Sequence, residues 1–189
     1  MELYKRIFRR MPKIQTERLL LRRIKMADAH DMYDYASRPE VTRYLLWYEH
    51  PDLSYTKRYI AYVDTQYRAG EFYDFAIIER ESKKMIGTCG FTRLDGENST
   101  GEVGYVLHPS FWGKGYATEA VEAIIRFGFE KLGLHRIEGR YMENNVASRR
   151  VMEKCGMRLE GVYHDFMVIK GRPEAVGVCA IFAKERAGE

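Results

Sequence analysis

A short glycine-containing stretch, residues 112–117 (Trp-Gly-Lys-Gly-Tyr-Ala), has the residue types and spacing that suit anion binding. It follows an apolar run from Val103 to Leu107 and opens an amphipathic segment, a pattern that predicts a strand, a tight turn and a helix. Glycines let main-chain amides converge, and a helix N-terminus adds partial positive charge. The stretch therefore predicts a loop that binds a ligand with phosphates.

Spacing excludes two familiar phosphate-binding loops. In a P-loop, four residues separate the two glycines, and Lys and Ser or Thr follow the second glycine. Here a single residue separates Gly113 from Gly115. A dinucleotide fingerprint reads G-x-G-x-x-G, and Thr118 stands at its third glycine position. On these residues alone, a strand-to-helix turn without a ligand remains the alternative.

The wider window, residues 102–120, resembles the acetyl-CoA-binding motif of the GNAT N-acetyltransferases, Gln/Arg-x-x-Gly-x-Gly/Ala. Trp112 takes the first position of that motif, and Gly115 and Ala117 match the later ones. A Trp there is similar to the branch that includes the ribosomal-protein N-terminal (alanine/serine) acetyltransferases. The window therefore suggests which ligand the phosphate loop holds.

Two further segments carry the same resemblance. Asn145-Val-Ala-Ser148 followed by Lys154-Cys-Gly-Met157 resembles that branch's Asn-x-x-Ser and Lys-x-Gly-Phe, with Met157 in place of Phe. Residues 16–22 (Thr-Glu-Arg-Leu-Leu-Leu-Arg) are similar to its first strand. The resemblance covers about residues 14–184 and is specific for the family, not for a substrate.

The resemblance implies acetyl-CoA as the co-substrate and no metal. It assigns main-chain groups of the strand before the loop to the pantetheine arm, and the loop amides to the pyrophosphate. The residues expected at this site are Val106, Leu107, His108, Trp112, Gly113, Lys114, Gly115, Tyr116, Ala117, Asn145 and Ser148.

Direct attack of an amine on a thioester needs no covalent intermediate, but the ammonium form must first lose a proton. Glu102 is the leading candidate base, because it starts the cofactor strand where several GNAT enzymes place a carboxylate. Glu160 is the second candidate and a predicted substrate contact, since the same branch has Glu before Gly there. A surface carboxylate near a strand end is the alternative for Glu102.

Protonation of the thiolate poses a separate problem. Many GNAT enzymes use a Tyr seven residues after the motif Asn, and Met152 occupies that position here. Ser148 is the expected substitute, because its hydroxyl donates a hydrogen bond. A helix cap or first-turn position is the alternative role for Ser148.

The acceptor is expected to be a primary amine, either a protein N-terminus or a small molecule. Trp47 is the best candidate for the acceptor pocket, because it lies in the loop where the family forms that pocket. A module of the same fold that binds CoA without turnover is the rival hypothesis, and an RNA-associated domain is a weaker one.

The apolar pattern predicts a first strand at 19–24, a helix from about 28 to 38 and a second helix from Ser54 to Gly70. Strands follow at 72–79, 85–94 and 102–107, then a helix at 117–132, a strand at 135–142, a short helix at 147–154 and a final hairpin at 158–168 and 176–183. This order favours an α/β (α+β) fold with a mixed, mostly antiparallel sheet of about seven strands and helices on both faces. The GNAT resemblance adds that the fourth and fifth strands splay apart.

Length and composition indicate one domain, which the GNAT resemblance places at residues 14–184, after a basic extension at residues 1–13. The chain has 189 residues with 46% hydrophobic and 31% charged residues, which is ordinary for a globular protein. Three widely spaced cysteines predict reduced, buried thiols in the cytoplasm, without disulfides or zinc. A net charge of +4 is mild. We therefore expect no membrane or direct nucleic-acid partner, and a monomer or homodimer.

Overall fold

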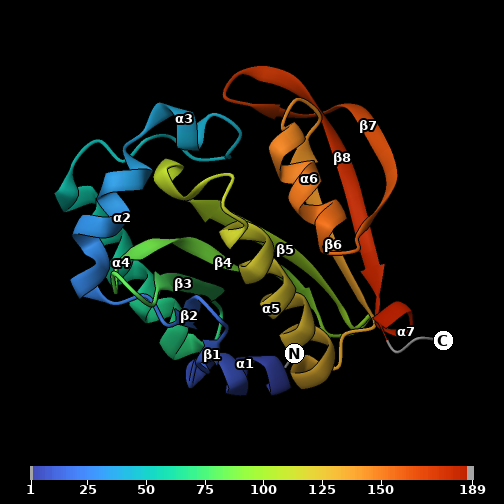
Figure 1. Ribbon diagram of the computed structural model, residues 1–189, viewed down its shortest axis with the longest axis horizontal. Helices are drawn as coiled ribbons and strands as arrows, with labels where there is room; N and C mark the ends of the chain where they lie inside the picture. The colour runs from blue at the N-terminus through green and yellow to red at the C-terminus, as the bar shows by residue number, and fades with distance from the viewer. Residues whose placement is uncertain (1, 187–189) are drawn as a thin grey trace.

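The computed structural model describes residues 2–186 and consists of one eight-stranded sheet with helices on both faces (Figure 1). The strand order is β1-β2-β3-β4-β5-β6-β8-β7. The strands are β1 (Ile14–Gln15), β2 (Leu19–Arg22), β3 (Tyr73–Glu79), β4 (Met85–Asp95), β5 (Thr100–Leu107), β6 (Arg136–Met142), β7 (Arg158–Ile169) and β8 (Arg172–Phe182).

Four of the helices, those that begin at Ala29, Leu53, Tyr116 and Val146, lie close to segments that the apolar periodicity predicts, whereas the short helices at residues 2–9, 39–42 and 183–186 were not predicted. The helices are α1 (Glu2–Arg9), α2 (Ala29–Ala36), α3 (Pro39–Thr42), α4 (Leu53–Ala69), α5 (Tyr116–Leu132), α6 (Val146–Lys154) and α7 (Ala183–Arg186), with 3-10 turns η1 (Met26–Asp28) and η2 (Pro109–Phe111). Within residues 2–186, no helix combines the length and apolar content that a transmembrane passage requires.

The predicted fold class is confirmed. Every neighbouring pair of strands is antiparallel except β5 and β6, which are parallel. The two-residue strand β1 adds one strand to the expected number of about seven. The predicted closing hairpin is β7 and β8, which starts its second strand earlier than expected, at Arg172.

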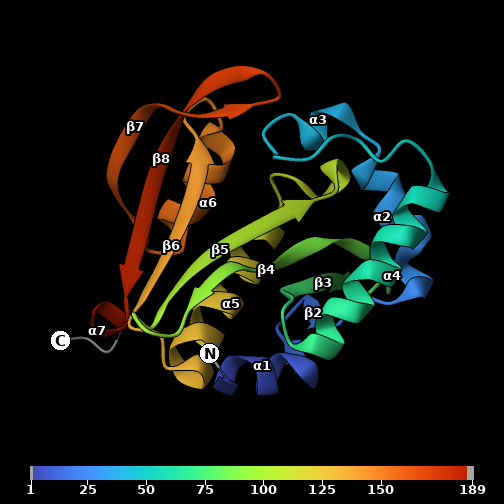
Figure 2. The ribbon, with the colours of Figure 1, turned by 180° about the vertical axis from the view of Figure 1, so that it is seen from behind.

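The pairing of β5 with β6 is short. It runs from Thr100 opposite Arg136 to Val103 opposite Gly139, and beyond that point the two strands diverge (Figure 2). These are the fourth and fifth strands of the sequence-based prediction, so the predicted splay is confirmed. The main chain of β5 from residue 104 onward therefore has a sheet neighbour on its β4 side and an open gap on the other.

Helices α5 and α6 cover one face of the sheet, and α2 and α4 cover the other (Figures 1 and 2). Helix α5 turns an apolar stripe toward β2, β4 and β5, as its three- and four-residue spacing predicts. The buried members of that stripe include Ala120, Val121, Ile124, Ile125 and Gly128. Side chains on one face of each strand therefore pack against α5 and α6, and those on the other face pack against α2 and α4.

Residues 2–9 form helix α1, which belongs to the packing of the domain rather than forming a separate basic arm. Phe8 is 0% exposed, and its ring lies 6.2 Å from that of Phe75 on β3 and 6.1 Å from that of Phe127 on α5. The basic residues of this segment obscured its amphipathic pattern. Met1, part of the expected extension, lies outside the described residues.

Replacement of Phe8 tests whether α1 is part of the folding unit. We expect Phe8→Ala to lower the free energy of unfolding by about 3–5 kcal/mol, because it leaves a cavity among buried rings. Urea denaturation measures this change. The control is Leu3→Ala on the same helix, where Leu3 is 48% exposed and a change within about 0.5 kcal/mol is expected. Equal effects of the two variants would contradict the assignment.

Candidate active site

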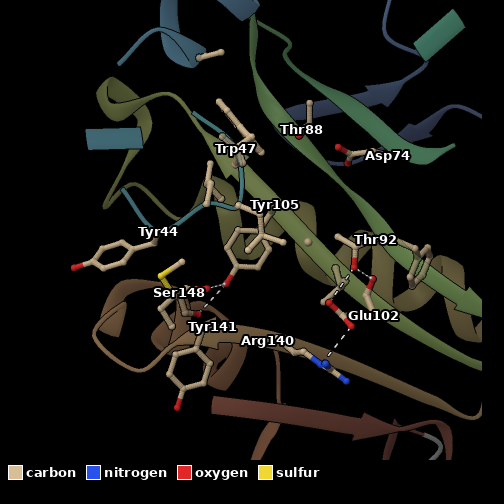
Figure 3. Close-up of a pocket in the computed structure, with 18 of the residues that line it drawn as sticks. Tyr44, Trp47, Asp74, Thr88, Thr92, Glu102, Tyr105, Arg140, Tyr141 and Ser148 are labelled. Atoms are coloured by element: carbon tan, nitrogen blue, oxygen red, sulfur yellow. Dashed lines mark hydrogen bonds and ion pairs between the residues drawn. The ribbon is translucent and has the colours of Figure 1, made fainter. Parts of the chain in front are cut away.

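A cavity of about 590 Å³ lies where β5 leaves β6. Its lining comes from both faces of the sheet: Trp47, Tyr59 and Asp74 from the α4 side, and Ser148 and Met152 from α6. Figure 3 shows Tyr105 and Ser148 on one side of the cavity and Asp74 and Thr88 on the other. The gap between β5 and β6 therefore connects the α4 side of the sheet with the α6 side. A reaction between two substrates requires such a connection.

The predicted phosphate loop has the backbone geometry of an anion site. Gly113 and Gly115 adopt φ angles of +71° and +81°, and Gly115 is the N-cap of α5. These left-handed conformations favour glycine. In the described part of the chain, no loop or capping hydrogen bond is donated by the main-chain amides of residues 113–117. The amides of the loop and of the first helical turn are thus available to an anion.

Arg18 holds this loop in place and adds positive charge beside it. Its guanidinium donates to the Lys114 carbonyl at 2.9 Å and to the Glu119 carboxylate at 2.7 Å. Burial alone would raise the pKa of Glu119, but hydrogen bonds from Thr16 and Arg18 hold it below the ordinary value. Neither Arg18 nor Glu119 was singled out from the sequence, because the contact joins residues 101 positions apart.

Alternation along β5 decides which main-chain groups face the gap. The His108 amide donates to the Ile86 carbonyl at 2.7 Å, so His108 is turned toward β4. Because neighbouring residues alternate between the two sides of a strand, Val106 also faces β4, whereas Tyr105 and Leu107 face the gap. Of the three predicted pantetheine partners, Val106, Leu107 and His108, the geometry favours Leu107, and it adds Tyr105.

The side chains next to the loop have structural partners. The Trp112 indole donates to the Leu107 carbonyl at 2.7 Å. His108 accepts at Nδ1 from the Ser110 amide, and its Nε2 lies 3.1 Å from the Asp34 carboxylate. Tyr116 lies under the Arg18 guanidinium at 4.3 Å. Trp112, His108 and Tyr116 therefore brace the turn, whatever else they contact.

Ser148 has a hydroxyl partner that was missed in the sequence. The Tyr105 hydroxyl lies 2.8 Å from the Ser148 hydroxyl and 2.8 Å from its carbonyl oxygen. Burial raises the pKa of Tyr105, and the hydrogen bond with Ser148 offsets only part of this. Asn145 caps α6 by accepting from the Ser148 amide at 3.1 Å. Met152, at the position of the usual tyrosine, lines the same cavity.

Glu102 also lines the cavity, but its carboxylate is engaged. Thr92 donates to Oε1 at 3.1 Å, and the Arg140 Nε lies 3.4 Å from Oε2 (Figure 3). Thr92 occupies a bulge in β4 between Phe91 and Arg93, a device that re-aims side chains near active sites. The structure thus places Glu102 at the site with partners on both of its oxygens.

Glu160 is not brought to the cavity. It lies on β7, where the Arg136 guanidinium donates to both of its oxygens, at 2.7 and 2.6 Å. The hydrogen bond from Arg136 holds the pKa of Glu160 below its ordinary value. A carboxylate in this state is a poor proton acceptor, and the lining of the cavity does not include it. The sequence motif alone did not show that β7 turns this side chain away.

Trp47 lines the cavity as expected, within a group of aromatic side chains. Its ring centroid is 5.5 Å from that of His50, and Tyr55 and Tyr59 lie 4.9 and 5.7 Å from the same imidazole. Burial lowers the pKa of His50, so it is neutral at pH 7. The α4 side of the cavity therefore has mainly aromatic, uncharged walls.

Asp74 interrupts these walls and was not singled out from the sequence. It lies on β3, lines the cavity and has one oxygen, Oδ1, that is buried without a hydrogen-bond partner. Burial raises its pKa to about 7, and the Thr88 hydroxyl and the Phe75 amide offset part of that rise. A charged residue inside the apolar run 72–79 was the signal in the sequence.

Comparisons with known proteins agree with this arrangement. The model of the acetyltransferase (GNAT) domain matches residues 18–158. The uncharacterized N-acetyltransferase p20 of Bacillus licheniformis is 36% identical over 94% of this chain and 100% of its own length. A crystal structure of a GNAT-family acetyltransferase from Bacillus anthracis superposes with a TM-score of 0.82 at 29% identity, covering 92% of this chain and 99% of that one.

The chain therefore belongs to the GNAT acetyltransferase family. It is an acetyl-CoA-dependent N-acetyltransferase. A more distant relative is the [ribosomal protein uS5]-alanine N-acetyltransferase of Escherichia coli, which is 26% identical over 86% of this chain and 87% of its own length. This relative supports the predicted ribosomal-protein acetyltransferase-like branch, although its identity to this chain is lower than that of the Bacillus licheniformis protein.

A charged substitution in the loop tests its role in binding. We expect Gly115→Glu to raise the Kd for acetyl-CoA at least about tenfold, about 1.4 kcal/mol, because the carboxylate repels phosphate among the loop amides. Gly133→Glu is the matched control, since Gly133 ends the same helix at φ +68° with open space around it. Both variants carry similar backbone strain, about 1–2 kcal/mol. Isothermal titration showing equal Kd values for the two would contradict the loop assignment.

Proposed function

We propose that this chain transfers the acetyl group of acetyl-CoA to a primary amine by direct attack of the amine on the thioester. The observation that carries the proposal is the cavity that joins the phosphate-loop side of the sheet to the aromatic side through the β5–β6 gap. A nucleophilic cysteine has no support, because burial raises the pKa of the Cys89 thiol and the cavity lining contains no cysteine.

The binding residues proposed for acetyl-CoA follow from the exposed main chain. The gap edge of β5, at Tyr105 and Leu107, suits the amides of the pantetheine arm, which would pair as a neighbouring strand does. The amides of residues 113–117 suit the pyrophosphate, with Arg18 and Lys114 supplying positive charge nearby. Acetyl-CoA, when bound, supplies the activated acetyl group and the thiolate leaving group.

Ser148 and Tyr105 are the groups proposed to serve the leaving sulfur. Tyr105 is protonated at neutral pH, since burial raises its pKa. Its hydroxyl donates to the Ser148 carbonyl at 2.8 Å and lies 2.8 Å from the Ser148 hydroxyl, so the Ser148 hydroxyl can serve the sulfur as a donor once its proton turns from Tyr105 toward the cavity. This pair would replace the tyrosine whose position Met152 holds.

The role of Glu102 as the base stays a prediction. Its place on the cavity wall supports it, whereas both of its carboxylate oxygens already have partners, Thr92 and Arg140. Asn145 caps α6 and so fixes the position of Ser148 at the start of that helix. Its proposed role on the cofactor side is therefore to position Ser148. The proposed acetyl transfer does not depend on which carboxylate takes the proton.

The acceptor is proposed to be an amine on a slender group, either a small molecule or the N-terminal residue of a peptide. The Lys170 ammonium on the β7–β8 turn donates to the Thr42 carbonyl at 2.8 Å and lies 5.0 Å from the Tyr48 ring centroid. This bridge joins the β7–β8 turn to the end of α3, beside Tyr48 and Ile169 of the cavity lining. The uS5-alanine acetyltransferase among the relatives supports a protein N-terminus.

A CoA-release assay on a panel of amines tests the function. We expect turnover with at least one primary amine and none with the matching alcohols, because only the amine is nucleophilic enough for direct attack. The panel contains small amines and short peptides with free or acetylated N-termini, and thiol release is followed with a chromogenic disulfide. Tight acetyl-CoA binding without release on any amine would contradict the proposal and favour a CoA-binding module without turnover.

Substitution of the hydroxyl pair tests its role at the sulfur. We expect Tyr105→Phe and Ser148→Ala each to lower kcat by up to about 100-fold, the lower end of general-acid effects. The double variant should lose little more, because residues acting as a unit are not additive. Tyr163→Phe, which removes an exposed hydroxyl on β7, is the control. Full kcat in the double variant would exclude the pair from catalysis.

A further inference from the structure

Asp74 is the unexplained feature of the cavity. Its Oδ1 is buried without a hydrogen-bond partner, a state that costs free energy unless a ligand relieves it. None of the groups that set its pKa is a cation. A carboxylate on a cavity wall with an unused oxygen and no counterion is suited to a cationic ligand.

The register of the sheet directs this carboxylate toward the reacting centre. Asp74 on β3 pairs with Gly90 on β4, and Gly90 pairs with Gly104 on β5, so the three share one face of the sheet. A Cβ at Gly90 would collide first with the main chain of β3, at the Tyr73 carbonyl oxygen and the Asp74 Cα, and Asp74 Oδ1 lies 2.9 Å from the same ideal position. Oδ1 therefore lies close to Gly90, and Gly104 is one strand spacing of about 5 Å further along the sheet.

Gly104 lies at the start of the gap between β5 and β6. It follows Val103, the last β5 residue paired with β6, so it stands at the fork of the gap. Gly104 and Thr92 line the cavity there, and the Thr92 methyl lies over the glycine, 2.5 Å from its ideal Cβ position. An amine held between Asp74 and Gly104 would face the fork from the α4 side.

Among residues 2–186, the groups that set the pKa of Asp74 include no cation that would neutralise it. The titratable groups that interact with it are Tyr35 of α2, Tyr59 and Tyr67 of α4 and Cys89 of β4. Burial raises the pKa of each, so all four are neutral at pH 7. The charged or histidine side chains elsewhere on the lining are His50, Glu71, Glu102 and Arg140.

We infer that Asp74 is the carboxylate that binds the acceptor in its ammonium form and takes the first proton from it. This inference rests on the proposed acetyl transfer and identifies the acceptor as a cation with an apolar or aromatic body. The walls around Asp74, with Trp47, Tyr55 and Tyr59, favour such a cation through their ring faces.

The proton and bond changes balance. The ammonium N–H bond breaks and its proton moves to the Asp74 carboxylate, which leaves a neutral amine. The nitrogen then forms a bond to the thioester carbonyl carbon, and the carbon–sulfur bond breaks. The second nitrogen proton accompanies the sulfur, giving the free thiol, and Asp74 returns its proton to solvent.

The pH dependence of kcat/KM is the experiment that tests Asp74, with the best acceptor of the amine panel. For the wild type we expect an increase with an inflection near pH 7, where the Asp74 carboxyl ionises. Asp74→Asn should lower kcat/KM at pH 7 by about 100-fold or more. Its profile should lack that inflection and rise tenfold per pH unit toward the pKa of the amine, since only free amine then reacts.

Two variants separate Asp74 from other carboxylates and from a structural role. Thr88→Val removes a hydroxyl that stabilises the Asp74 carboxylate, so the inflection should move to higher pH. Glu102→Gln should leave the inflection in place. An inflection that disappears in Glu102→Gln and persists in Asp74→Asn would assign the base to Glu102 and overturn the inference.

Thermal stability gives a test that needs no acceptor. A carboxyl whose pKa is raised on folding contributes stability at low pH that is lost as the pH rises through the folded-state value, here about 7. Asp74→Asn should therefore raise Tm more at pH 8.5 than at pH 5.5. An equal shift at both would contradict the inference.

The outcomes also distinguish the two levels of the proposal. Wild-type protein that binds acetyl-CoA but releases no thiol with any amine would overturn the proposed function and this inference together. Wild-type turnover with unchanged rate and pH profile in Asp74→Asn would overturn the inference about Asp74 and leave acetyl transfer standing.

Discussion

The rest of the structure depends on the main-chain hydrogen bonds that β5 gives up when it leaves β6. Past the Val103–Gly139 pair, the edge of β5 has amides and carbonyls but no neighbouring strand. Buried main-chain groups in this state are costly, and most folds cover such an edge. Here the edge faces a cavity, so an extended ligand with amides of its own can take the place of the strand.

That ligand needs an anchor, and the fold provides it where the same strand ends. The chain leaves β5, turns through η2 and enters α5 at Gly115, so the loop amides and the gap edge lie on one continuous path. Arg18, which precedes β2, donates to the Lys114 carbonyl of the loop at 2.9 Å and forms a salt bridge with Glu119 of α5 at 2.7 Å, so the loop is fixed to the start of β2. A long ligand can therefore bind with its charged end at the loop before α5 and with its middle along the free edge of β5.

Local features of the site were predictable from the sequence, and features created by packing were not. The phosphate loop, the splayed strands, Ser148 and Trp47 all follow from short motifs or a resemblance that spans them. Tyr105 looks like an ordinary strand residue until α6 places Ser148 against it. Asp74 sits in an apolar run, and its significance comes from a glycine on the next strand and tyrosines on two helices. Glu160 fitted a motif, but the pairing with Arg136 across strands decides its state.

The short seam between β5 and β6 has a mechanical consequence. Residues 100–103 and 136–139 form the ladder that joins β1–β5 to β6–β8, and at the far end of the gap the Lys170–Thr42 contact ties the two parts again. Between these points the Tyr105 hydroxyl of β5 contacts Ser148 of α6 across the gap, so a side-chain contact rather than a strand ladder joins the two parts there. A ligand bound along the gap would add contacts to both parts. Binding of the first substrate would therefore set the distance between β5 and β6 that the second substrate meets.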